Sequence, residues 1–173
     1  MYKDGLVLLN IGVSPVEAGT VSGNRNARYN EEISLTATSG EGYTFSHWMV
    51  NGVERGSETI MSHTAVADAD IVAVFTRNTY TVEIGGDVEG GSITGFSTGI
   101  YSYGDELRLM AVPETGYKFS YWVIDGERKG DTPEMTMKVT SDVTVSAKFK
   151  YDGQYHWRLD LASGWNWISS YLS

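Results

Sequence analysis

The stretch GYTFSHWMVNG at residues 42–52 returns as GYKFSYWVIDG at residues 116–126, an offset of 74 residues. The similarity continues on both sides of this stretch. Upstream the offset falls to 72, because the second copy holds two extra residues between Gly95 and Tyr103. A match of this length indicates an internal duplication. The chain of 173 residues is therefore organised around two related copies.

The duplication predicts two tandem modules and a remainder. We place the first module at residues 1–76, the second at residues 77–150 and a separate C-terminal segment at residues 151–173. No stretch rich in Pro, Gly or Ser separates the modules at residues 76–79, so the sequence predicts a direct strand-to-strand connection and a semi-rigid tandem. Each module is near the size at which a single core is marginal, and we expect contact between neighbours to add stability.

Apolar and polar residues alternate within each copy. The alternation is clear at residues 33–37, 80–84 and 143–149, and a period of two is typical of half-buried strands in an antiparallel sheet. Asn51-Gly52 and Asp125-Gly126 each follow an apolar run and predict tight hairpins, because both turn positions favour positive φ. No window has a helical period of helical length. The sequence therefore predicts an all-β fold of two small antiparallel modules, each with about four to six short strands.

Aromatic residues make up 12% of the chain, and part of this set recurs between the copies. Trp48 and Trp122 occupy equivalent positions in an apolar strand, and a large ring that returns at the same position is most simply the core of each module. The predicted core aromatics are Phe45, Trp48, Phe75, Phe119, Trp122 and Phe149.

The order of short motifs in both copies is distinctive. Gly-Thr/Ser-Val/Ile-x-Gly is followed by Tyr-x-x-Glu-Ile/Leu-x-Leu-x-Ala, Gly-Tyr-x-Phe-x-x-Trp-x-x-Asn/Asp-Gly and Asp-x-x-Ile/Val-x-Ala-x-Phe. This order resembles the divergent internalin-type B-repeat family of bacterial surface proteins, over about residues 16–76 and 80–150. The resemblance implies small, mainly β, β-grasp-like modules found in tandem in extracellular or cell-envelope proteins. It supplies no catalytic residues.

Charge and cysteine content exclude several function classes. The chain has 13 Lys and Arg against 22 Asp and Glu, a net charge of −9, with the acidic residues scattered. Nucleic acid and anionic membranes are poor partners, because both require clustered basic residues. The absence of Cys excludes disulfides, zinc-thiolate sites and thiol nucleophiles. No window approaches the ~20 apolar residues of a membrane helix, and residues 1–13 do not have the pattern of a signal peptide.

One catalytic motif is present in the sequence. GFSTG at residues 95–99 matches the Gly-x-Ser-x-Gly nucleophile elbow, which requires a strand before the serine and a helix after it. Both flanks here are turn-like or β, so a serine hydrolase using Ser97 is a remote alternative. His47 and His63 have no counterpart in the second copy, and His156 lies outside both copies. We therefore expect no catalytic residues and a protein that is not an enzyme.

The carboxylates suggest turns more than a metal site. Asp68, Asp70, Asp142 and the pair Asp105-Glu106 do not form a loop with the pattern of a calcium motif. We interpret Asp68 and Asp142 as turn residues whose side chains bond the backbone two residues further on. The sequence predicts no metal and no cofactor.

Some aromatic residues do not belong to the recurring core set. Tyr101 and Tyr103 lie close to the loop that differs between the copies, and Trp165 and Trp167 lie in the C-terminal segment. Exposed rings of this kind can stack on sugars or bury against a protein partner, so these four residues are the candidate contacts to a ligand. Alternation in residues 157–169 predicts a hairpin, which packs on the second module or begins a further one.

These observations favour a non-enzymatic repeat region of an exported bacterial cell-surface protein, acting as a spacer, stalk or adhesion-related module. The alternative is a module that binds carbohydrate or host protein through exposed Tyr and Trp. The expected partners are other modules of the same polypeptide, and glycan or host protein under the alternative. The extracellular location follows from the family resemblance, and the sequence does not indicate an oligomeric state.

Overall fold

The computed structural model describes residues 5–23, 26–86 and 88–153. Every regular element in these residues is a β-strand, which confirms the predicted all-β class. None of the described residues belongs to a helix long and apolar enough to cross a membrane. The hairpin predicted in residues 151–173 falls, after Gly153, outside the described residues.

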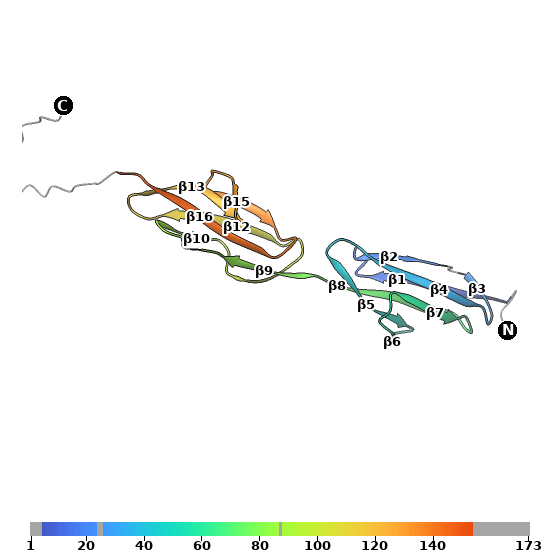
Figure 1. The fold of residues 1–173 in the computed structure, drawn as a ribbon. Helices are drawn as coiled ribbons and strands as arrows, with labels where there is room; N and C mark the ends of the chain where they lie inside the picture. Colours follow the sequence, from blue (N-terminus) through green and yellow to red (C-terminus); the bar gives the residue numbers. More distant parts are fainter. Residues whose placement is uncertain (1–4, 24–25, 87, 154–173) are drawn as a thin grey trace, which may run out of the picture.

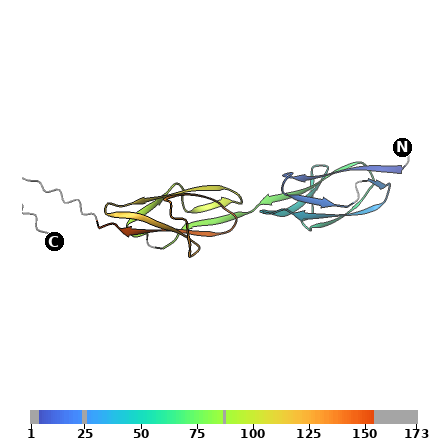
Figure 2. The same ribbon diagram turned by 90° about the horizontal axis from the view of Figure 1, so that it is seen from above.

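The two copies fold into two similar modules that follow one another end to end (Figures 1 and 2). The first module contains β1 (Leu6–Ser14), β2 (Gly19–Ser22), β3 (Asn26–Arg28), β4 (Glu32–Ser39), β5 (Tyr43–Val50), β6 (Val53–Arg55), β7 (Ile60–Thr64) and β8 (Ala69–Arg77). The second contains β9 (Thr79–Ile84), β10 (Gly91–Thr94), β11 (Gly99–Ser102), β12 (Glu106–Pro113), β13 (Tyr117–Ile124), β14 (Glu127–Lys129), β15 (Glu134–Lys138) and β16 (Val143–Tyr151). The prediction of four to six strands per module was too low, because strands of three residues such as β3 and β6 are too short to display a period.

Each module packs a five-stranded sheet against a three-stranded sheet. The orders are β3-β1-β8-β5-β6 with β2-β4-β7 in the first module, and β11-β9-β16-β13-β14 with β10-β12-β15 in the second. Buried residues of both sheets form one core in each module, as in a β-sandwich. The described residues contain no α-helix of the kind that a β-grasp-like module packs on its sheet, and a three-stranded sheet covers the five-stranded one instead.

The five-stranded sheets are mixed, which corrects the prediction of purely antiparallel modules. β1 pairs in parallel with β8, from Leu9 opposite Ala69 to Ser14 opposite Val74. β9 pairs in parallel with β16 in the same way. Alternation of apolar and polar residues reports which face of a strand is buried and carries no information about the direction of its neighbour. The first and last strands of each module are therefore adjacent and run the same way.

The recurring tryptophans lie at the centre of each core. Trp48 and Trp122 are 1% and 0% exposed. Each indole donates a hydrogen bond to a backbone carbonyl ten residues further on, Glu58 for Trp48 and Thr132 for Trp122, both at 2.9 Å. The neighbouring phenylalanine rings pack against them, at centroid distances of 5.5 Å for Phe45–Trp48 and 5.5 Å for Phe45–Phe75, and of 5.3 Å for Phe119–Trp122 and 6.0 Å for Phe119–Phe149.

Asp68 and Asp142 act across the parallel strand pairs, which corrects their interpretation as local turn residues. The Asp68 carboxylate accepts a hydrogen bond from the backbone N–H of Leu8 at 2.8 Å, and Asp142 accepts one from Thr81 at 2.7 Å. Each acceptor lies immediately before the last strand of its module, and each donor lies on the first strand. The recurring aspartate therefore extends the parallel ladder by one bond between segments about sixty residues apart in sequence.

The two predicted hairpins are confirmed. Asn51 and Gly52 have φ values of 51° and 77° between β5 and β6, and the corresponding turn joins β13 to β14. The Asn51 side-chain oxygen accepts a hydrogen bond from the N–H of Asp70 at 2.9 Å, and the Asn51 N–H donates to the Asp70 carbonyl at 2.8 Å. Asp125 makes the same two bonds with Thr144. The turn residue thus fixes the hairpin to the start of the central strand.

We predict that Asn51→Ala destabilises the first module, because alanine loses the bond to Asp70 and is strained at positive φ. The expected loss in the free energy of unfolding is about 1–3 kcal/mol, measured by urea denaturation. Asn51→Asp is the matched control, since aspartate holds this position in the second copy and retains the acceptor oxygen. Equal losses for the two variants would contradict the proposed role of the side chain.

Candidate functional site

A single residue separates the last strand of the first module from the first strand of the second. β8 ends at Arg77, β9 begins at Thr79, and Asn78 lies between them. The Asn78 N–H donates to the Gly42 carbonyl at 2.9 Å, and its own carbonyl accepts a bond from the N–H of Tyr103 at 2.8 Å. Asn78 is therefore hydrogen-bonded through its backbone to both modules. We call this contact region, formed by residues 41–44, 77–78 and 103–105, the joint.

The Asn78 side chain adds a third bond on the side of the first module. The hydroxyl of Thr44 donates to the Asn78 side-chain oxygen at 2.7 Å. Together with the two backbone bonds, this contact holds Asn78 to Gly42 and Thr44 of the first module and to Tyr103 of the second. The direct connection expected from the sequence is thus held by specific hydrogen bonds at the point where the modules meet.

Tyr103 reaches from the second module onto the first. Its ring lies so close to Gly42 that a Cβ atom at Gly42 would overlap it, and Gly42 also has a φ of 75°. A hydrogen bond to Glu41, burial of the phenol and the negative charge of Glu41 all raise the pKa of Tyr103 above its ordinary value of 10.0. Glycine at position 42 is thus required both by its backbone conformation and by the ring that covers it.

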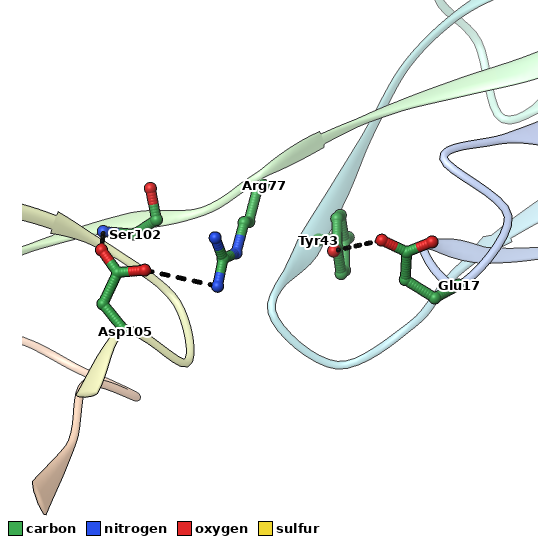
Figure 3. A network of polar contacts seen from close by, with 5 residues as sticks. All are labelled: Glu17, Tyr43, Arg77, Ser102 and Asp105. Atoms are coloured by element: carbon green, nitrogen blue, oxygen red, sulfur yellow. Dashed lines mark hydrogen bonds and ion pairs between the residues drawn. The ribbon is translucent and has the colours of Figure 1, made fainter.

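Charged side chains surround the joint (Figure 3). Arg77 of β8 lies 3.4 Å from Asp105 of the second module, and the other carboxylate oxygen of Asp105 accepts a bond from the Ser102 N–H at 2.9 Å. The side chains of Arg77 and Asp105 are 45% and 38% exposed, so solvent screens this pair and it contributes about 0–1 kcal/mol. On the other side of Arg77, the Tyr43 hydroxyl donates to Glu17 at 3.2 Å. Burial and this bond raise the pKa of Tyr43.

The structure places the candidate ligand contacts as follows. Tyr101 is half-buried against the core of the second module, and its hydroxyl bonds both backbone groups of Ser97, at 2.7 Å to the carbonyl and 3.3 Å from the N–H. Tyr103 is half-buried at the joint. Trp165 and Trp167 lie outside the described residues. Tyr101 therefore stabilises the variable loop, and Tyr103 packs at the joint.

Ser97 does not have the surroundings of a nucleophile elbow. It lies in the loop between β10 and β11, so a strand and not a helix follows it. His47 and His63 belong to β5 and β7 of the other module, and the His47 Nδ1 atom lies 2.9 Å from the hydroxyl of Ser46. His156 lies outside the described residues. The geometry gives no support to hydrolysis at Ser97.

An open apolar groove of about 390 Å³ crosses the first module between the edge strands β6 and β7, above Trp48. Ile60 at its rim is 60% exposed, and the His63 Nε2 atom beside it is buried without a hydrogen-bond partner. The second copy has Glu134 and Met137 at the corresponding positions. Across the described part of the chain, no three acidic or histidine side chains are grouped so that they could hold a metal ion.

Sequence reasoning identified residues 76–79 as the junction but missed Asn78 as its centre. The available signal was positional, because Asn78 and Asp152 stand at the same place after the last strand of each copy. It also missed that Tyr103, proposed as a ligand contact, packs on the neighbouring module. Period and composition do not reveal which residues meet across a junction, because these contacts join surfaces that fold separately.

The comparisons with known proteins agree with this architecture. A family model described as the divergent InlB B-repeat domain matches residues 9–79 and 80–153, so the two matches meet within two residues of Asn78. Neither a comparison with curated proteins nor one with solved structures gives a significant match. B-repeat domains are typical of the repeat regions of extracellular surface proteins. As the sequence motifs predicted, the chain belongs to the divergent InlB B-repeat family, of which it carries two tandem copies.

Proposed function

We propose that this chain is a non-enzymatic spacer in an exported bacterial cell-surface protein, and that it sets the distance and direction between the parts of the polypeptide on either side. The observation that carries the proposal is the joint, where Asn78 bonds to both modules and Tyr103 covers Gly42. A connection of one residue leaves little room for independent motion of the modules.

The energy of the joint supports a semi-rigid arrangement. Bending at Asn78 breaks its bonds to Gly42, Thr44 or Tyr103, each worth about 1 kcal/mol net, and uncovers the Tyr103 ring. A total of about 2–3 kcal/mol makes the bent state roughly 30- to 150-fold less populated than the straight one. The net charge of −9 fits the same role, because it opposes association between copies of the protein at a cell surface.

The alternative function, binding of glycan or host protein through exposed aromatics, has weaker support. The rings of Tyr101 and Tyr103 contact residues of the chain itself, so neither is an open platform for a sugar. Trp165 and Trp167 remain candidates for such contacts. A glycan array and a tryptophan fluorescence titration of the full chain test this alternative, and binding that Trp165→Ala and Trp167→Ala abolish would support it.

We predict that Tyr103→Ala loosens the joint without unfolding either module. The chain has no Cys, so Ser62→Cys and Thr136→Cys, at exposed and equivalent positions of the two modules, can carry spin labels. Pulsed electron paramagnetic resonance should give a narrow distance distribution for the labelled chain and a broader one after Tyr103→Ala. The matched control is Tyr29→Ala, which removes the equivalent tyrosine of the first module, away from the joint. A broad distance distribution in the labelled chain with Tyr103 intact would contradict the proposed spacer function.

We also predict that the joint weakens at high pH. The pKa of Tyr103 is raised in the folded chain, so this group contributes stability that is complete below pH 10.0 and is lost as the pH rises through the raised pKa. The distance distribution between residues 62 and 136 should therefore broaden above pH 10.0. Glu41→Gln removes the nearby negative charge and should lower the pKa of Tyr103. Carbon NMR of labelled tyrosine measures this pKa in the variant and in the original chain. An unchanged titration in this variant would contradict the bond to Glu41.

A further inference from the structure

The two outer ends of the tandem each contain one half of the joint. At the joint, Asn78 donates to Gly42 and accepts from Tyr103. At the C-terminal end of the second module, the N–H of Asp152 donates to the Gly116 carbonyl at 2.7 Å, which repeats the first bond. At the N-terminal end of the first module, the N–H of Tyr29 donates to the Gly5 carbonyl at 2.8 Å, which repeats the second. The register places Gly5 and Asp152 at the position of Asn78.

The C-terminal end also repeats the side-chain contact to the residue after the last strand. The Lys118 ammonium lies 2.9 Å from the Asp152 carboxylate, at the positions that Thr44 and Asn78 hold in the joint. Gly116 has a φ of 87°, close to the 75° of Gly42. The carbonyl and the loop glycine that receive the second module at the joint are therefore present again beyond it.

The N-terminal end repeats the loop that carries Tyr103. The Arg28 N–H donates to the Glu31 carboxylate at 2.7 Å, as Ser102 does to Asp105 at 2.9 Å. The backbone bond from Asn30 to Ala65 corresponds to the bond from Gly104 to Val139. The two loops differ in the burial of their tyrosine. The Tyr103 ring is half-buried against Gly42, whereas Tyr29 is 54% exposed. The first module thus presents a preformed tyrosine loop on its outer end.

We propose that the N-terminal end of the first module is a docking surface for the C-terminal end of another module of the same kind, joined through one residue in the register of Asn78. Its contact residues are Tyr29 and Glu31, and the surface it fits is the one that Gly116, Lys118 and Asp152 form on the second module. The inference rests on the proposed spacer function and extends it, because such a spacer is lengthened by whole modules with no flexible linker between them.

A joint between this second module and this first module is not identical to the existing one. Tyr151 stands where Arg77 stands at the joint, and its ring packs on Tyr117 at a centroid distance of 5.5 Å. At the position of the Arg77–Asp105 ion pair this end therefore has an aromatic pair, with the Tyr151 ring beside Gly116. We expect the bonds at Asp152, and packing of the Tyr29 ring against this aromatic pair, to hold the new joint.

The test is a four-module chain in which residues 1–152 are followed directly by residues 6–173 of a second copy. Spin labels on residues 62 and 136 of one copy report the original joint. Labels on residue 136 of the first copy and residue 62 of the second report the new joint, across equivalent positions. The expected result is a narrow distribution for the new joint, as narrow as that for the original joint.

Two substitutions test whether the proposed contacts are the ones that restrict motion at the new joint. Tyr29→Ala in the second copy should broaden the distribution for the new joint and leave the original joints unchanged, whereas Tyr103→Ala in both copies should do the reverse. A Gly-Ser insertion after Asp152 provides the flexible reference. The inference is overturned if the new joint is as broad as this reference while the original joints stay narrow. If the original joints are broad as well, the spacer function itself fails along with the inference.

Discussion

The parallel pairing between the first and last strands of each module is the constraint on which the rest of the structure depends. Because β1 and β8 run side by side in the same direction, the chain enters a module at one end and leaves at the other. An antiparallel pair would bring both ends to the same side. Asp68 and Asp142 support this pairing with a bond from each last-strand turn to the first strand.

The end-to-end arrangement of the modules follows from that pairing. The last strand of the first module continues past Asn78 into the first strand of the second, and a lateral connection is not needed (Figure 1). The joint can then be small, because a connection of one residue between two sheets already limits the relative orientation of the modules. Tyr103 and the pair Arg77–Asp105 add contacts around this fixed point.

The copies also differ at exposed edges that lie away from the joint. Ile60 and His63 line an apolar groove in the first module, and Glu134 and Met137 replace them in the second. Residues that form the core and the hairpin turns keep their chemistry between the copies. The joint keeps its glycine and its tyrosine, since Gly42 corresponds to Gly116 and Tyr103 to Tyr29, but Lys118 and Tyr151 stand at the positions of Thr44 and Arg77. This division fits a protein in which the fold of the modules is shared, and the exposed edges of each module are free to vary.

The repeat, the all-β class, the hairpins at Asn51 and Asp125 and the family were all determined by the sequence, because each depends on residue types at short range or on a match between the copies. The direction of the strand pairing, the partner of Asp68 and the packing of Tyr103 on Gly42 were decided only by the tertiary structure. Their partners lie on distant strands or on the other module, and no local pattern specifies contacts between segments that meet only after each module has folded.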